Sequence, residues 1–342
     1  MKRNILLCLL LISGYSQMNG QSKLLSGPVT VKKIWDSAAY NSFTDLIRFD
    51  NAFYCAFREG TSHVSSKNDG HLRILKSTDG TAWHSVALLK VKGLDLRDPK
   101  LSVTPDHRIM VTTAGAIFNA KLKAQKLFPM VSFSDNKGLH FSEPQAAKID
   151  QVSDTSLNWI WRVTWHHGTG YGIDYHMKYA DDPHATRSAR LLLVQTKNGV
   201  NFTQIPGISA DGFPNESTIR FNKSDEMFVL IRRDAGDKMG VLAKSAPPYH
   251  DWKYTKLDFQ LGGPNFLVLK NNLIIATRQY SSPATTVLLL TDLQGKVVKK
   301  ITLPSGGDTS YPGLVLYQHT LWVSYYSSHE GKASIYLAQI PM

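Results

Sequence analysis

The chain has 342 residues, of which 42% are hydrophobic and 10% aromatic, so it is long enough to bury a large core in one or two domains. Its formal net charge of +12 comes from lysines and arginines scattered along the chain, which argues against a nucleic-acid-binding protein with a dense basic patch. This charge fits either a solvated basic surface or a cleft that attracts anionic ligands.

The N-terminal residues are typical of a secretory signal peptide. Lys2 and Arg3 give a positive start, residues 5–12 are apolar, and residues 13–21 are small and polar. The apolar run is too short to span a bilayer. We therefore predict a signal peptide over residues 1–20, one domain over residues 21–342, and a secreted or periplasmic protein without stable membrane insertion. After cleavage only Cys55 remains, so we expect a buried cysteine and no intramolecular disulfide.

Short β-branched and aromatic runs, separated by Gly, Asn, Asp and Pro, fill the rest of the chain. This pattern repeats about six times at a spacing of about fifty to sixty residues, which indicates propeller blades. The units open near Asn41, Leu94, Asn158, Phe213, Gly262 and Ser310. In the first unit the predicted strands cover residues 43–49, 52–58, 71–76 and 84–90, and in the last they cover residues 311–316, 321–326 and 333–339.

Turn motifs recur between the third and fourth strands of the units. Residues 77–83 read Ser-Thr-Asp-Gly-Thr-Ala-Trp, residues 134–141 read Ser-Asp-Asn-Lys-Gly-Leu-His-Phe, and residues 196–202 read Thr-Lys-Asn-Gly-Val-Asn-Phe. Degenerate forms occupy residues 245–252 and 291–295. The hydroxyl and carboxamide or carboxylate groups can bond the turn backbone, glycine accepts positive φ, and the aromatic ring can pack back on the sheet. We expect a structural role for these turns.

The turns resemble the Asp-boxes, or BNR repeats, of the sialidase superfamily, whose pattern is Ser-x-Asp-x-Gly-x-x-Trp. The second motif has that length, with Asn136 in the position of the aspartate. The resemblance covers nearly the whole mature chain and implies an all-β, six-bladed β-propeller, in which ring closure leaves few exposed sheet edges. It also implies that the first strand of every blade faces one central funnel.

In that arrangement the starts of the first strands supply the site. They carry Thr44-Asp45, Arg97-Asp98-Pro99-Lys100, Trp161-Arg162, Asn215-Glu216, Pro264-Asn265 and Tyr311. Any one of these residues could instead form hydrogen bonds or ion pairs between blades, but so polar a set indicates function.

The resemblance assigns catalytic roles to three residues. Tyr311 opens the last blade, where sialidases have their nucleophilic tyrosine, and Glu216 opens blade four as its activating base. A neutral tyrosine suits a 2-keto sugar acid because the carboxylate on the anomeric carbon would repel an anionic nucleophile. The acid/base aspartate of the family lies in a blade-one loop, where Asp69 matches best, although Asn-Asp-Gly is also a common turn.

The resemblance also implies a carboxylate clamp built from Arg232 and Arg278. Arg232 could alternatively form only a cross-strand ion pair with Glu216. The chain departs from the family at the start of blade one, where Phe43-Thr44-Asp45-Leu46 replaces Arg-Ile-Pro and so removes the first clamp arginine.

Two explanations of this departure stay open. Either Arg97 or Arg162 from a neighbouring blade replaces the missing guanidinium, or Asp45 binds sugar hydroxyls and the substrate is not a sialic acid. Trp161 is the tryptophan that we expect to contact the ligand. We expect no metal and no cofactor, because His166 and His167 are adjacent and should point to opposite sides of a strand.

The sequence thus predicts an exported glycoside hydrolase that resembles exo-sialidases and releases a terminal acidic sugar, either sialic acid or another 2-keto-3-deoxy acid, from a glycan. One alternative is a propeller that binds glycans without cleaving them. The other is a glycosidase or polysaccharide lyase of different specificity on the same fold.

Overall fold

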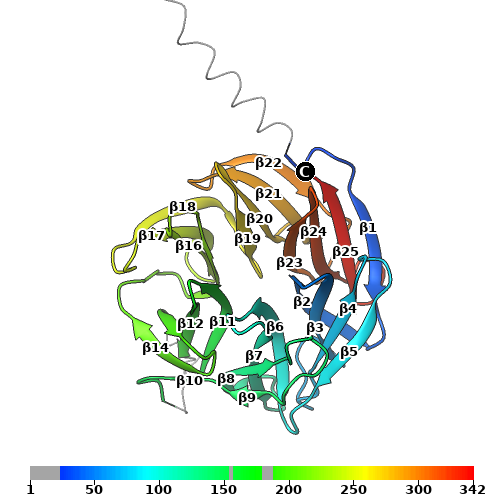
Figure 1. Ribbon diagram of the computed structural model, residues 1–342. Coiled ribbons are helices and arrows are strands. Elements are labelled where there is room, and N and C mark those ends of the chain that lie inside the picture. Colours follow the sequence, from blue (N-terminus) through cyan, green and yellow to red (C-terminus); the bar gives the residue numbers. More distant parts are fainter. Residues whose placement is uncertain (1–23, 154–156, 179–187) are drawn as a thin grey trace, which may run out of the picture.

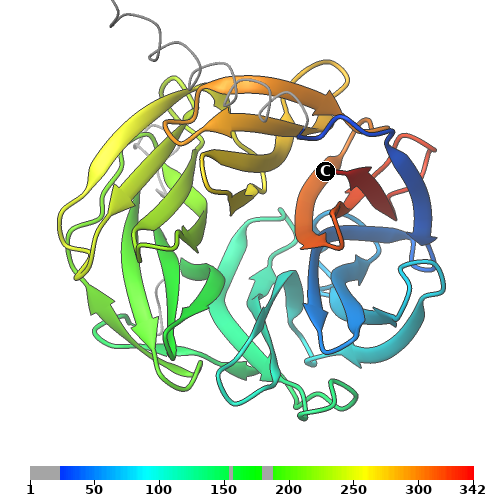
Figure 2. The ribbon, with the colours of Figure 1, turned by 45° about the horizontal axis from the view of Figure 1, so that its top comes forward.

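Six β-sheets follow one another around a ring in the computed structural model, which describes residues 24–153, 157–178 and 188–342 (Figures 1 and 2). The prediction of an all-β, six-bladed propeller is therefore confirmed. Within the described residues there is no helix of the length and apolar character that a membrane span requires. The predicted signal peptide lies outside the described residues.

In blades one, two, four and five the strands run in chain order from the axis to the rim, whereas the outer strands of blades three and six come from earlier in the chain. Blade one contains β2 (Tyr40–Phe49), β3 (Ala52–Gly60), β4 (His71–Ser77) and β5 (His84–Leu89), and blade two contains β6 (Asp95–Val103), β7 (Ile109–Phe118), β8 (Ala124–Phe133) and β9 (Gln145–Ala146). Blade three contains β11 (Leu157–His166), β12 (Thr169–Lys178), β13 (Ser188–Thr196), β14 (Asn201–Ile205) and the outer strand β10 (Lys148–Ile149). Blade four contains β15 (Pro214–Phe221), β16 (Met227–Arg233), β17 (Met239–Ser245) and β18 (Lys253–Gln260), and blade five contains β19 (Asn265–Val268), β20 (Asn272–Gln279), β21 (Thr285–Asp292) and β22 (Val297–Thr302).

Blade six joins the two ends of the chain. It contains β23 (Thr309–Tyr317), β24 (Thr320–Ser327) and β25 (Ser334–Pro341), and its outer strand is β1 (Thr30–Trp35). β1 pairs antiparallel with β25, with Thr30 opposite Gln339 and Val31 opposite Ala338 (Figure 1). The fourth strand missing from the last predicted unit thus comes from the start of the chain, and the ring is closed by hydrogen bonds.

The hydrophobic core lies between neighbouring blades. Phe228 and Leu230 of β16, for example, belong to the same buried cluster as Phe266 and Ile275 of blade five. Middle strands such as β16 are almost entirely buried because both of their faces meet a sheet, so they read as continuous apolar runs. Cys55, also on a middle strand, is fully buried as expected.

The turn motifs fix the outer hairpins as expected. In blade one the Ser77 hydroxyl accepts a hydrogen bond from the Gly80 amide at 2.9 Å, and Asp79 Oδ1 accepts one from the Thr81 amide at 2.7 Å. Gly80 has a φ of +75°, and Trp83 donates its indole N–H to the Gly80 carbonyl at 3.2 Å.

The second motif differs from its predicted alignment. Asp135, not Asn136, accepts the turn hydrogen bonds, from the amides of Lys137 at 3.1 Å and Leu139 at 2.9 Å. The ionised carboxylate is the stronger acceptor, and these bonds help to hold the pKa of Asp135 below its usual value. The apparent match in motif length was therefore misleading.

Candidate active site

The inner strands β2, β6, β11, β15 and β23 each carry a β-bulge. On β2, Ser42 pairs with Arg58 and Asp45 with Ala56, so two residues lie opposite one. The bulged pairs are Phe43-Thr44, Asp98-Pro99, Trp161-Arg162, Asn215-Glu216 and Tyr311-Pro312. A bulge changes the direction of the side chains that follow it, and bulges are frequent beside active sites. Five of the six polar strand starts identified in the sequence therefore fall within or next to these bulges, and only Pro264-Asn265 of blade five does not.

Tyr311 and Glu216 meet at the centre of the ring. The Tyr311 hydroxyl donates to Glu216 Oε1 at 2.6 Å, and Arg232 Nη1 lies 2.5 Å from the same oxygen and 3.4 Å from the Tyr311 hydroxyl. The other carboxylate oxygen accepts the Gly263 amide at 2.8 Å. The structure thus brings together three of the residues predicted from the sequence and adds a fourth group, a backbone amide.

The electrostatics of this cluster keep Glu216 ionised and Tyr311 neutral. Burial opposes ionisation of Glu216, but the Arg232 charge and the hydrogen bonds from Tyr311 and Gly263 hold the pKa of the carboxyl below its usual value. Burial, and then the Glu216 charge, raise the pKa of Tyr311 well above its usual value. A proton can therefore pass from Tyr311 to Glu216 only as the tyrosine oxygen forms a new bond.

Gly263 fixes the Tyr311 ring. Its φ is +58°, and a Cβ at this position would lie 2.5 Å from Cγ of Tyr311. Only glycine allows this backbone to lie against the ring face while its amide reaches Glu216. No local pattern in the chain signals this role, because Gly262-Gly263-Pro264 is typical of an ordinary turn.

A second polar cluster lies beside Tyr311 and centres on Asp308. Arg278 Nη2 and the Tyr326 hydroxyl contact Asp308 Oδ1 at 2.9 and 2.6 Å. His63 Nδ1 lies 2.7 Å from Oδ2, which also accepts from the Tyr40 hydroxyl. Arg278 thus reaches the site as predicted, with its guanidinium carbon 5.6 Å from the Tyr311 ring centroid, but it already has a carboxylate partner.

Arg97 reaches the same region from blade two. Its Nη1 donates to the His63 carbonyl at 2.9 Å and contacts Asp95 Oδ2 at 3.3 Å. Asp95 is itself held by two bonds from Arg58, at 2.7 and 2.9 Å. Arg97 therefore supports the loop that carries His63.

Asp45 and Arg162 lie below the site and bind each other. Their Oδ2 and Nη1 are 2.6 Å apart, and the side chains are 0% and 4% exposed. A ligand in the funnel of this structure does not reach Asp45, so Asp45 does not take the place of the missing clamp arginine. The bulge explains the difference: Phe43, at a φ of +60°, is the blade-one side chain that packs on the Tyr311 ring, with ring centroids 5.0 Å apart.

Trp161 is also buried below Tyr311, with ring centroids 5.7 Å apart, and Lys100 Nζ lies 4.6 Å from its ring centroid. The tryptophan that lines a cavity is Trp159, which stacks on Tyr175. This cavity of about 240 Å³ is also bordered by Glu216, Arg232 and Arg97.

Asp69 lies in the predicted blade-one loop, between β3 and β4. It is half-buried, does not line this cavity, and its Oδ1 has no hydrogen-bond partner among the described residues. From the same loop His63 makes the contact with the Asp308 cluster.

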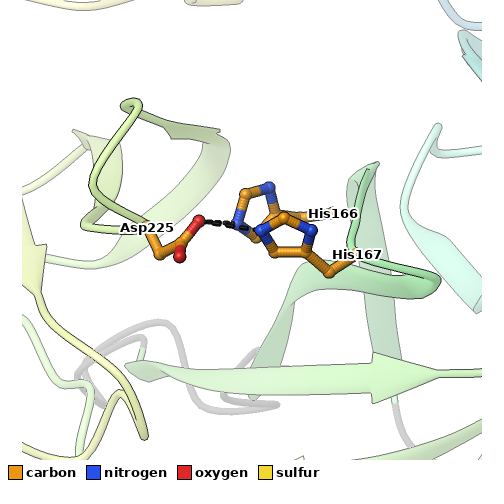
Figure 3. Close-up of side chains that lie close together, drawn as sticks. All are labelled: His166, His167 and Asp225. Atoms are coloured by element: carbon orange, nitrogen blue, oxygen red, sulfur yellow. Dashed lines mark hydrogen bonds and ion pairs between the residues drawn. The ribbon is translucent and has the colours of Figure 1, made fainter.

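The prediction that His166 and His167 point to opposite sides of a strand is wrong. Both Nε2 atoms contact Asp225 Oδ1, at 2.8 and 2.9 Å (Figure 3). β11 ends at His166, and His167 has a φ of +46°, so strand alternation stops between the two residues.

The chain matches known proteins by structure but not by sequence. No family model matches the chain, and no curated protein matches its sequence. Its structure is similar to that of a Dyadobacter fermentans protein described as of unknown function, with a TM-score of 0.75 and 16% identity over 91% of this chain and 99% of that one.

The structure is also similar to sialidases. Trypanosoma rangeli sialidase, in complex with the inhibitor DANA, matches with a TM-score of 0.73 and 8% identity over 92% of this chain and 60% of that one. The Hadza microbial sialidase Hz136 matches with a TM-score of 0.67 and 13% identity over 89% of this chain and 66% of that one. The chain thus has a sialidase-like propeller fold and spans less than two thirds of the length of these two sialidases.

Proposed function

We propose that the protein is a glycoside hydrolase that uses Tyr311 as its nucleophile and Glu216 as the base that activates it. The observation that carries this proposal is the 2.6 Å hydrogen bond from the Tyr311 hydroxyl to Glu216, in the funnel of a sialidase-like propeller. The similar fold of Trypanosoma rangeli sialidase, of which one structure with 2,3-difluorosialic acid is described as a covalent intermediate, supports a mechanism through an enzyme-bound sugar.

The reaction has two steps. First, the Tyr311 oxygen bonds to the anomeric carbon and passes its proton to Glu216, while the glycosidic bond breaks and the leaving oxygen takes a proton from a general acid. Second, water attacks the anomeric carbon and gives a proton to the conjugate base of that acid, and Tyr311 leaves with the proton held by Glu216. Arg232, 3.4 Å from the tyrosine hydroxyl, stabilises the negative charge on both groups.

We assign the acid/base role to His63 and Asp308 rather than to Asp69. Burial raises the pKa of Asp308, whereas burial and the charges of Arg97, Arg278 and Arg58 lower the pKa of His63. These shifts bring the two proton affinities closer together across a 2.7 Å contact. Asp308, which burial makes easier to protonate than a free carboxyl, can donate a proton in the first step and recover one in the second, with His63 in contact with it.

The substrate we propose is a glycan with a terminal 2-keto sugar acid. Arg232 and Arg278 are the guanidiniums placed to meet its carboxylate, and their side chains are 15% and 16% exposed. Each already contacts a carboxylate of the protein, so the substrate must compete with Glu216 and Asp308. Structures of Trypanosoma rangeli sialidase contain sialic acid and a difluoro derivative of 2-keto-3-deoxy-nononic acid, which supports this substrate class.

The test is release of free sugar acid from sialosides and from glycosides of other 2-keto-3-deoxy acids. Tyr311→Phe and Glu216→Gln should each remove all measurable turnover. Tyr325→Phe is the matched control, because Tyr325 is a buried tyrosine of the same blade whose hydroxyl bonds the Pro304 carbonyl at 2.7 Å, away from this site. Full activity of folded Tyr311→Phe would refute the mechanism.

The His63–Asp308 pair favours a polysaccharide lyase as the second candidate. An imidazole of lowered pKa, oriented through Nδ1 by a carboxylate, is suited to remove a carbon-bound proton beside a uronic-acid carboxylate. A lyase would produce unsaturated uronic acids, whereas the hydrolase produces saturated sugars, so the product decides between the two. Saturable glycan binding without any product would instead support the glycan-binding propeller.

A further inference from the structure

Two histidines and one aspartate lie together where β11 and β15 end. These strand ends lie away from the bulges of the candidate active site. His166 and His167 belong to blade three and Asp225 to blade four (Figure 3). The two Nε2 atoms and one carboxylate oxygen all lie within 4.8 Å of one another. We propose that these three residues bind a divalent transition-metal ion, with Zn²⁺ as the best fit.

The positions of the ligand atoms require little change to bind zinc. Zn²⁺ holds imidazole nitrogen and carboxylate oxygen at about 2.0–2.2 Å in a tetrahedron, which places neighbouring ligand atoms roughly 3.3–3.5 Å apart. In the structure Asp225 Oδ1 lies 2.8 Å from His166 Nε2 and 2.9 Å from His167 Nε2. Each of these two contacts must therefore lengthen by about half an ångström when the ion binds.

The donor set selects the class of ion. Two neutral imidazoles and one carboxylate suit Zn²⁺ and other borderline transition metals, whereas Ca²⁺ and Mg²⁺ prefer sites made only of oxygen. Three protein ligands leave the fourth tetrahedral position to water. The His167 and Asp225 side chains are 75% and 46% exposed, so an ion and its water can enter from solvent.

Neighbouring groups hold two of the ligands in place. The His166 ring stacks on Phe221, with centroids 4.0 Å apart and planes 5° from parallel. The Asp225 carbonyl accepts the Tyr249 hydroxyl at 3.1 Å, and Asp225 has a φ of +60° in its turn. Fixed ligands lower the entropy cost of metal binding, so this arrangement favours binding over a chance meeting of surface side chains.

The ion would join blades three and four on the side of the ring away from Glu216 and Tyr311. Because it binds only where the turns after β11 and β15 are both in place, it would stabilise the folded chain and contribute nothing to the active-site chemistry. The proposal is therefore independent of the proposed function.

The experiment uses the full mature chain without a histidine tag, freed of metal with a chelator. Calorimetric titration with ZnCl₂ should show one ion per chain, and near-saturating Zn²⁺ should raise the midpoint of thermal unfolding by about 3–6 °C. Ca²⁺ and Mg²⁺ should do neither. His167→Ala and Asp225→Asn should each weaken Zn²⁺ binding by roughly tenfold or more, since each loses one of three ligands.

His107→Ala is the matched control. His107 Nε2 contacts Asp50 Oδ1 at 2.9 Å, so this exposed pair has the same chemistry but lacks a third ligand in the described part of the chain. Zn²⁺ binding should be unchanged in this variant. Absence of saturable binding to the wild-type protein, or equal binding by wild-type, His167→Ala and Asp225→Asn proteins, would overturn the proposal.

Discussion

Asp45→Ala is expected to destabilise the propeller by about 3–5 kcal/mol, because it leaves the Arg162 guanidinium buried without its partner. The two side chains are 2.6 Å apart and 0% and 4% exposed, and Asp45 also accepts the Leu101 amide at 2.7 Å. Burial, and then the Arg162 charge, lower the pKa of Lys100 to about 8 and that of Arg220 to about 9, and Asp45 opposes both shifts. Asp45 thus offsets part of the positive charge of Lys100, Arg162 and Arg220.

The assay is urea unfolding followed by tryptophan fluorescence, together with thermal unfolding. An unfolding entropy of about 2.1 cal/mol/K per residue converts the expected loss into a fall of roughly 4–7 °C in the thermal midpoint. Asp50→Ala is the control, since its pair with His107 is exposed and should be worth less than about 1 kcal/mol. If the two variants lost equal stability, the reasoning about buried charge in this propeller would be refuted.

Two further predictions concern the site itself. Burial raises the pKa of Asp98 to about 6, although the charges of Arg97 and Lys100 oppose this shift. The folded protein therefore binds a proton at Asp98 more tightly than the unfolded chain does. As a result, Asp98 lowers the stability of the fold as the pH rises from about 4 to 6. Asparagine tolerates the φ of +46° at this position, so Asp98→Asn keeps the backbone conformation. The stability of this variant relative to wild type should rise by about 1–3 kcal/mol as the pH goes from 4 to 7. A stability difference that stays constant over this range would contradict the prediction. Gly263→Ala should reduce turnover in the proposed hydrolysis by about 100-fold, because the new methyl group must displace the Tyr311 ring by roughly 1 Å. Gly331→Ala is its control, as Gly331 has a φ of +85° with no described atom within 4 Å of the added carbon, and similar activity of the two variants would refute the role of Gly263.

The fold was predictable because its signals are local and repeated. The first predicted strand set agrees with β2, β3, β4 and β5 to within three residues at each end. Turn chemistry at Ser77 and Asp79 depends on neighbours within a few positions, so it can be read directly from the chain. The pairing of β1 with β25 was missed because no local pattern links segments about three hundred residues apart.

The site was predictable in part. Resemblance placed Tyr311, Glu216 and Arg232 in one funnel, and the structure brings them within hydrogen-bond distance. The orientation of Asp45 could not be predicted, because a bulge changes which residues of a strand face the axis, and its position is not visible in an alternating pattern.

The contact made by the loop between β3 and β4 could not be predicted for a different reason. His63 meets Asp308 across 245 positions of sequence, and Asp308 precedes its strand in a loop that carries no motif. Such a contact depends on the closed ring and cannot be read from either segment alone.

Because β1 pairs with β25, the propeller cannot close until nearly the whole described chain has been synthesised. β1 leaves the ribosome early, but its partner residues on β25 are made only some three hundred residues later, or about 15–60 s at 5–20 residues per second. Throughout that interval β1 has a free edge, and β24 gains its outer neighbour only when β25 arrives. A chain released before Ser334 would keep both edges unpaired, so the synthesis of β25 converts an open array of sheets with exposed edges into a closed ring.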